Sequence, residues 1–323
     1  MTRIKPENTQ AILIGASEFD CANKNFQNLP NVKTNLLELN RLLIEVVGID
    51  KNQICMMLDK DNSSEITSKI IGVIPNALDT IIVYYAGHGI YRLPDFYLTT
   101  KKTQPKEPEY TGAIRAKDLV NLVLKKAKAK NIIFIIDCCF SARAKEGVDS
   151  KGKQVFFITA APSTQAAKDE SPEDANYTAF THELLLILKR GIENAGEFLT
   201  FQDISNHLNK QLTGKDLPEP QLSTHGSPDK LGICKNRQGA LNNPVVPVPN
   251  KLNRLKDFFS TKEKSFVVSI ATIVVLVVLG IFLVLQLLVS KSEAPISVQI
   301  STGKNSPAIK DTTIEGNLVI GDK

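Results

Sequence analysis

The 323-residue sequence contains only five cysteines, and no two of them form a CxxC pair. This pattern excludes a disulfide-stapled fold and offers no zinc-ligand spacing. The formal net charge is only +5, and the basic residues are scattered along the chain. We therefore expect no nucleic-acid binding. The first 25 residues show no basic segment followed by an apolar one, so we expect no secretory signal and a reducing cytosol around the N-terminal part.

Motifs for common cofactors are also missing. Gly214-Lys215 and Gly303-Lys304 lack the further glycine and the hydroxyl residue of a phosphate loop. No HExxH motif or paired Cys/His arrangement indicates a catalytic metal. The sequence thus predicts no required cofactor, although the acidic segment Asp169–Asp174 leaves surface calcium binding, and activation by calcium, open.

One long apolar run is present. The 24 residues from Phe266 to Val289 carry no charge, and this exceeds the roughly 20 residues that a helix needs to cross a bilayer. Five basic residues lie in 251–264 and one in 290–303, so the positive-inside rule places the N-terminal part in the cytoplasm. We expect a single-pass membrane protein with its C-terminal tail outside.

Composition divides the chain into four parts. Residues 1–235 form the expected folded domain, and 236–264 are a linker rich in proline, asparagine and basic residues. Residues 265–289 are the predicted transmembrane helix, and 290–323 are a short tail of unassigned role.

Short apolar runs alternate with helix-period segments through the first part, which predicts an α/β fold with a mostly parallel sheet flanked by helices. The expected strands are Ala11–Gly15, Gln53–Leu58, Thr80–Ala86, Asn131–Asp137 and Val155–Ala160. The expected helices are Asn35–Val47, Ser64–Leu78, Ala116–Lys128, Tyr177–Arg190 and Phe201–Leu212.

Two strand ends carry residues suited to catalysis, because ligands gather at the carboxyl ends of parallel strands. His88 lies between two glycines after the third expected strand, and Cys139 follows the fourth. A cysteine nucleophile needs an imidazole to take its proton and backbone donors for the developing oxyanion. We predict His88 and Cys139 as the catalytic pair, with the N–H groups of Gly89 and Cys139 as oxyanion donors.

The segments Tyr84-Tyr85-Ala86-Gly87-His88-Gly89 and Asp137-Cys138-Cys139-Phe140-Ser141-Ala142 resemble the caspase-like cysteine peptidases, closest to metacaspases and prokaryotic caspase homologues. The resemblance covers roughly residues 8–235. It aligns Cys139, rather than Cys138, with the nucleophile and His88 with the catalytic histidine. The spacing of about 50 residues between them is typical of caspases.

Structural roles are the alternative for these residues. A Gly-His-Gly turn can simply end a strand, and a buried cysteine is often an inert small hydrophobe. Because side chains alternate along a strand, we expect Cys138 to point away from Cys139 and pack in the core. The remaining histidines are expected at the surface: His182, His207 and His225.

The resemblance also implies a pocket for a basic P1 side chain. In metacaspase-like members an acidic residue two before the nucleophile helps to bind it, and Asp137 has that position. A second aspartate normally comes from the first helix, where this sequence has Asn35. The preference for Arg or Lys is therefore expected to be weakened. Asn35 is equally well explained as a helix N-cap.

The family pattern has glycine where this sequence has Ala142, which would be strained if the backbone needs a positive φ there. The following segment, Ser141–Gln154, reads as a flexible basic loop and suggests self-cleavage, although a solvated loop explains the same residues. The candidate cleavage positions are Arg143, Lys145, Lys151 and Lys153.

The sequence thus predicts a membrane-anchored cysteine endopeptidase that acts on protein or peptide substrates. The family resemblance suggests a role in regulated cell death, stress response or defence, with an oligomer or an upstream activator as a possible partner. One alternative is a catalytically silent scaffold that binds a partner protein at the membrane. Another is a thiol hydrolase or transferase that acts on small molecules.

Overall fold

The computed structural model describes residues 1–20, 26–106, 109–146, 149–168 and 170–238. They belong to the first of two units into which the chain divides, Met1–Val245. Within these residues, no helix is both long and apolar enough to span a bilayer. The predicted transmembrane segment 265–289, most of the linker and the whole tail lie outside the described residues.

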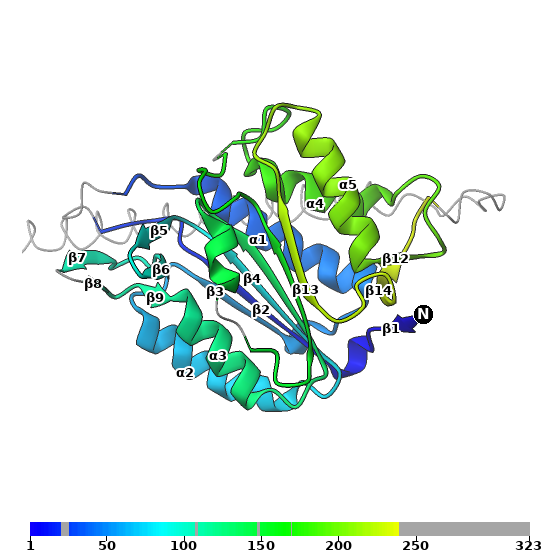
Figure 1. Cartoon of the computed structure of the whole chain (residues 1–323), viewed down its shortest axis with the longest axis horizontal. Helices are drawn as coiled ribbons and strands as arrows, with labels where there is room; N and C mark the ends of the chain where they lie inside the picture. Colours follow the sequence, from blue (N-terminus) through cyan, green and yellow to red (C-terminus); the bar gives the residue numbers. More distant parts are fainter. Residues whose placement is uncertain (21–25, 107–108, 147–148, 169, 239–323) are drawn as a thin grey trace, which may run out of the picture. The chain divides into compact units, whose positions relative to one another are not determined.

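A six-stranded sheet forms the centre of the unit, in the order β13-β11-β10-β4-β2-β3 (Figure 1). All neighbours are parallel except β13, which pairs antiparallel with β11. The strands are β2 (Thr9–Gly15), β3 (Ile54–Leu58), β4 (Thr80–Ala86), β10 (Asn131–Asp137), β11 (Gln154–Thr159) and β13 (Gln221–His225). The mostly parallel sheet is confirmed, and the five predicted strands agree with the structure to within two residues at each end.

Helices cover both faces of this sheet. They are α1 (Pro30–Leu42), α2 (Ser63–Val73), α3 (Ala116–Lys126), α4 (Ala179–Arg190) and α5 (Phe201–Thr213). One apolar cluster joins the sheet to α1, α4 and α5, and a second joins the opposite face to α2 and α3 (Figure 1). Burial from both sides explains why β2 and β4 contain no exposed residue.

Smaller sheets surround the central one, and the sequence analysis did not predict them. β5 (Gly89–Arg92), β6 (Asp95–Leu98) and β9 (Ile114–Arg115) form an antiparallel sheet beyond β4. The other short strands are β1 (Thr2–Arg3), β7 (Gln104–Lys106), β8 (Glu109–Thr111), β12 (Phe198–Thr200) and β14 (Leu231–Lys235). Apart from the five-residue β14, these strands have two to four residues, which is too short to show a period in the sequence.

The first helix begins earlier than the sequence predicts. It starts at Pro30, whose fixed φ suits the first helical position, rather than at Asn35. After Leu42 the chain continues as a π-helical turn, and Gly48 ends it with a φ of 87°. Asn35 therefore lies inside the helix, where its side chain faces the core.

An ion-pair group connects α1 to α4. Glu38 Oε1 lies 2.7 Å from Arg41 Nη2 and 2.7 Å from Lys189 Nζ. The bond from Arg41, with that from Lys189, outweighs burial and lowers the pKa of Glu38 to about 2. The group holds together the two helices that contribute polar side chains to the region described next.

Candidate active site

The two predicted catalytic residues lie just beyond neighbouring strand ends. β4 and β10 are parallel, and their last paired residues are Ala86 and Asp137. The amide of Gly87 then donates to the carbonyl of Asp137 at 3.3 Å, which continues the pairing by one step. His88 and Cys139 each follow two residues after this last pair, and both are partly exposed. The fold therefore brings both residues to the same edge of the sheet.

Gly89 allows the histidine turn to approach the cysteine segment. A Cβ at this position would collide with the carbonyl oxygen of Cys139 and would lie 2.9 Å from Cys138 Sγ. The backbone of Gly89 therefore lies directly against that of Cys139, and only glycine permits this contact. The oxyanion role of the Gly89 and Cys139 amides stays a prediction, and this approach is what it requires.

The ring of His88 is held by a loop that follows β2. Its Nε2 lies 2.8 Å from the carbonyl oxygen of Gln27. Because a carbonyl can only accept, Nε2 carries the proton, and the neutral ring then keeps Nδ1 as its acceptor. The rings of Phe19 and Phe26 lie 5.1 Å and 5.5 Å from the imidazole, centroid to centroid. This arrangement fixes one tautomer and restricts the tilt of the ring.

The two adjacent cysteines have different surroundings. Cys138 is buried, and burial raises the pKa of its thiol well above the ordinary value. A thiol in this state is a poor nucleophile, so the prediction that Cys138 packs in the core is confirmed. Cys139 is partly exposed, as a nucleophile must be to reach a substrate.

The sharp turn after Cys139 uses Phe140 rather than Ala142. Phe140 has a φ of 56°, and its amide donates to the carbonyl of Gln165 at 2.9 Å. Ala142 has no positive φ, and its amide donates to the carbonyl of Ala161 at 3.1 Å. The replacement of the family glycine by alanine therefore causes no backbone strain here.

Asp137 is almost completely buried, with 3% of its surface exposed. Its Oδ2 accepts hydrogen bonds from the hydroxyl groups of Thr178, at 2.5 Å, and Thr181, at 2.6 Å. Both threonines stand at the beginning of α4, where the helix dipole also favours a negative charge. The carboxylate is thus stabilised by directed hydroxyl donors at the N-terminal end of a helix.

Asn35 belongs to the same buried network. Its Nδ2 donates to Thr178 Oγ1 at 2.8 Å, and the amide of Thr178 lies 3.3 Å from Asn35 Oδ1. Leu29, not Asn35, has the N-cap position of α1, so the N-cap interpretation was wrong. Because the Asn35 amide donates to Thr178, the hydroxyl proton of Thr178 is directed onto Asp137.

The residues that connect these side chains were not predicted from the sequence. Phe19 and the carbonyl of Gln27 come from a loop, and no local pattern indicates their contact with a histidine 61 or more positions away. Thr178 and Thr181 could have been suspected, because residues three apart share one face of a helix. Their common target, Asp137, was visible only in the structure.

The basic segment after Cys139 is more ordered than expected. Its first five residues form a 3-10 helix, Ser141–Lys145, which contains two of the candidate cleavage positions. Arg143 Nε donates to the carbonyl of Ser163 at 3.0 Å, and its guanidinium lies 3.5 Å from the centroid of the Tyr91 ring. The prediction of a flexible loop was therefore wrong for residues 141–145.

The other two candidate positions differ in how they are held. Lys153 Nζ donates to the carbonyls of Ala127, at 2.9 Å, and Ala129, at 3.2 Å. Lys151 is exposed and has a φ of 51°. Its amide donates to Asp149 Oδ1 at 3.0 Å. Self-cleavage stays a prediction, and Lys151 is the most exposed of the four candidates.

The expectation that the other histidines lie at the surface was wrong for His182. This residue is 8% exposed, stacks on the Tyr177 ring at 5.4 Å and lies 2.8 Å from Ser171 Oγ through its Nδ1. The loop before α4 covers it. His207 is partly buried, and His225 is exposed, as predicted.

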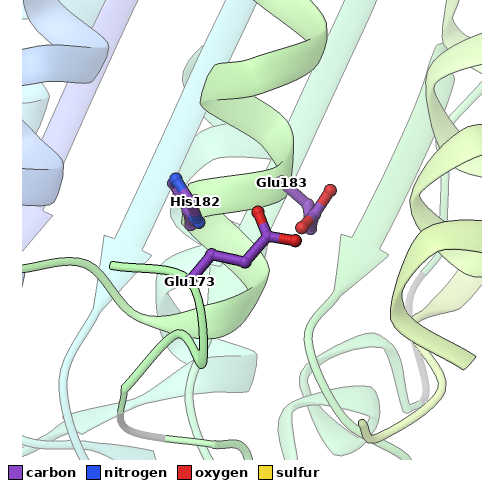
Figure 2. A group of neighbouring side chains, drawn as sticks. All are labelled: Glu173, His182 and Glu183. Carbon is purple, nitrogen blue, oxygen red and sulfur yellow. The ribbon is translucent and has the colours of Figure 1, made fainter. Parts of the chain in front are cut away.

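Among the described residues, His182 also belongs to the one group whose side chains could hold a metal ion, with Glu173 and Glu183 (Figure 2). Their ligand atoms lie within 4.8 Å of one another. Lys215 Nζ lies 2.6 Å from Glu173 Oε1 and also pairs with Glu183. Burial lowers the pKa of Lys215, but the bonds to the two carboxylates outweigh it and raise the pKa. An ammonium group therefore already supplies the positive charge here.

Calcium binding at Asp169–Asp174 stays an open prediction. Asp169 lies outside the described residues. Asp174 Oδ1 accepts from the backbone and side-chain amides of Asn176, at 3.0 Å and 2.8 Å, in a local turn.

Comparison with known families identifies the fold. Residues 8–231 match a family model described as "Caspase domain". The match covers more than half of the chain. No curated protein sequence matches the chain.

Two solved structures have a similar fold. One is protein GSU0716 from Geobacter sulfurreducens, with a TM-score of 0.52 and 16% identity over 72% of this chain and 98% of that chain. The other is caspase-1 from Spodoptera frugiperda, with a TM-score of 0.50 and 12% identity over 72% of this chain and 92% of that one. At such low identity the likeness concerns the fold.

The contact at Gly89 leads to a test. In Gly89→Ala the new Cβ would push the histidine turn away from Cys139, so we expect a loss of stability of about 2 kcal/mol and a lower reactivity of Cys139 toward a thiol probe. Gly72→Ala is the matched control, because a Cβ there meets nothing within 4 Å. Thermal unfolding and labelling rates of both variants check this. If Gly89→Ala kept the stability and the Cys139 labelling rate of the wild type, the two segments would not be in close contact.

Proposed function

Because the chain belongs to the family of proteins with a caspase domain, we propose that it is a cysteine endopeptidase with Cys139 as nucleophile and His88 as general base. The observation that supports this most is the meeting of two strand ends that are distant in sequence. The turn at Gly89 fits against the backbone of Cys139, and the partly exposed side chains of His88 and Cys139 follow the same paired edge.

The proposed reaction uses groups that this chain supplies. Nδ1 of His88 accepts the thiol proton of Cys139, and the thiolate attacks the scissile carbonyl to form an acyl-enzyme. The same imidazole then gives its proton to the leaving amine, and a water molecule later releases the acyl group. The Gln27 carbonyl holds the opposite ring nitrogen, so the imidazolium that forms is stabilised in place.

We propose a basic P1 preference that rests on Asp137. This carboxylate is 3% exposed, so its charge acts in surroundings of low dielectric constant, where electrostatic interactions are stronger than in water. Thr178 and Thr181 both donate hydrogen bonds to its Oδ2. The amide of Asn35 adds no second charge, which agrees with a moderate preference for Arg and Lys over neutral residues.

We also propose that the chain is anchored in a membrane by the uncharged run from Phe266 to Val289, with the caspase domain in the cytoplasm. The support is the length of the run and the excess of basic residues before it. The full chain is expected in the membrane fraction of expressing cells, resistant to alkaline carbonate extraction. Recovery of the full chain in the soluble fraction would contradict the proposal.

The peptidase proposal is tested with the full chain and fluorogenic peptides that carry Arg, Lys, Asp or a neutral residue at P1, with and without calcium. We expect cleavage after Arg and Lys. Cys139→Ala should abolish it, and His88→Ala should lower kcat by roughly 10²- to 10⁴-fold, the usual contribution of a general base. Cys138→Ala should stay within a few-fold of the wild type, because its thiol is buried behind the site.

Two other results would be informative. Cleavage after Asp would overturn the role given to Asp137. If no peptide is cleaved and an active-site thiol probe also fails to label Cys139, the silent scaffold becomes the better explanation.

Asn35→Asp tests the pocket assignment. A carboxylate at this position would add a negative charge next to Thr178 and would compete with Asp137 for its hydroxyl proton. We expect the ratio of kcat/KM for Arg over a neutral P1 residue to rise about tenfold, equivalent to ~1.4 kcal/mol. Asn40→Asp makes the same chemical change on the same helix, away from Asp137, and should leave the ratio unchanged. If this ratio of kcat/KM values is unchanged in Asn35→Asp as well, Asn35 does not contribute to the P1 pocket.

A further inference from the structure

The loop that holds His88 is anchored by an aspartate from another part of the sheet. Asp59 directly follows β3, and its amide donates to the carbonyl of Gly15 at 2.9 Å. Its carboxylate accepts three hydrogen bonds from the chain after β2. They come from the amide of Ser17 at 2.6 Å, the hydroxyl of Ser17 at 2.7 Å and the amide of Glu18 at 3.0 Å. Hydrogen bonds to an ionised carboxylate are among the stronger ones in proteins.

Further hydrogen bonds connect the segment that Asp59 holds to the residues that contact His88. The carbonyl of Ser17 accepts from the amide of Leu29 at 2.8 Å, and the amide of Phe19 donates to Asn28 Oδ1 at 3.0 Å. These two bonds close the base of the loop, so its two ends lie side by side. One end carries Phe19, and the other carries Gln27, whose carbonyl accepts from His88.

Burial restricts the movement of the residues that connect Asp59 to His88. Ser17 is 3% exposed and Phe19 is 7% exposed, so neither can shift without disturbing its neighbours. Asp59 has a φ of 50°, in the left-handed region, which aspartate tolerates better than most residues. The surrounding bonds hold the residue in this uncommon conformation, in which its carboxylate faces the loop amides.

We propose that Asp59 is a positioning residue that sets the orientation of the His88 ring through Ser17, Phe19 and the Gln27 carbonyl. For the reaction itself this inference rests on the proposed peptidase function. The orientation of the His88 ring does not depend on that function, so the peptidase proposal and the positioning role of Asp59 can fail separately.

Three variants of the full chain separate the possible causes. Asp59→Gly removes the acceptors but fits the positive φ without strain. Asp59→Asn removes the charge but keeps an oxygen for the two amides, and its NH₂ group can donate to the Ser17 hydroxyl. Asp61→Asn is the matched control, because Asp61 lies two residues away and pairs with Lys102 at 2.6 Å. Thermal unfolding of each variant shows which ones are folded.

Kinetics provide the first measurement. A small displacement of a catalytic group can cost about 100-fold in rate. We expect Asp59→Gly to lower kcat at least about tenfold with KM changed less than about threefold, because the group affected acts in the transition state. Asp59→Asn should recover most of kcat, and Asp61→Asn should resemble the wild type. A folded Asp59→Gly with wild-type kcat would overturn the proposal.

Nuclear magnetic resonance provides the second measurement, and it does not need activity. The chain has four histidines, so a sample with labelled histidine rings gives few signals, and His88→Gln identifies the one of interest. The Phe19 and Phe26 rings lie close enough to shift the His88 signals by ring currents. In the Cys139→Ala background, we expect Asp59→Gly to move the His88 signals toward the values of an exposed histidine, and Asp59→Asn to leave them in place.

The two measurements together identify which idea fails. If no substrate is cleaved by the wild type but the His88 signals move in Asp59→Gly, the peptidase proposal fails and the positioning role of Asp59 stands. If the signals stay in place in a folded Asp59→Gly variant, the positioning role is wrong whatever the activity is.

Discussion

The parallel pairing of β4 with β10 is the constraint on which the rest of the site depends. Its register places Ala86 opposite Asp137, where both strands end, and His88 and Cys139 each follow two residues later in the chain. A shift of one residue would turn every side chain of a strand to the other face, so the buried apolar residues on both faces fix this register. The geometry of the proposed site thus follows from hydrophobic packing along two strands that contain neither His88 nor Cys139.

A buried carboxyl group is the second organising feature. Asp137 ends β10, and its carboxylate is satisfied by Thr178 and Thr181 at the beginning of α4. Thr178 is bonded in turn to Asn35 of α1. A buried carboxylate without donors would cost several kcal/mol, so this network must form when the helices pack on the sheet. The hydrogen bonds that Asp137 accepts therefore join β10, α1 and α4 next to Cys139.

The histidine side of the site depends on a different kind of support. Among the described residues, the Phe19 and Phe26 rings and the Gln27 carbonyl hold the ring of His88. The loop that carries them is closed by hydrogen bonds at its base. Cys139, the proposed nucleophile, follows the end of β10 in the central sheet, whereas the ring of His88, the proposed base, is oriented by a loop. The proposed site therefore combines one segment that is fixed by the core of the sheet with one that is fixed by hydrogen bonds and aromatic contacts.

The sequence by itself determined five of the six central strands, the helices between them and the two strand ends that precede His88 and Cys139. Its apolar runs and helical periods are local signals, and they are strong where burial is complete. The start of α1, the burial of His182, the order in residues 141–145 and the network around Asp137 were decided only by tertiary structure. Their causes are contacts between segments far apart in the chain, such as Asn35 with Thr178 and Asp59 with Ser17, and no local pattern encodes which distant donor will meet which acceptor.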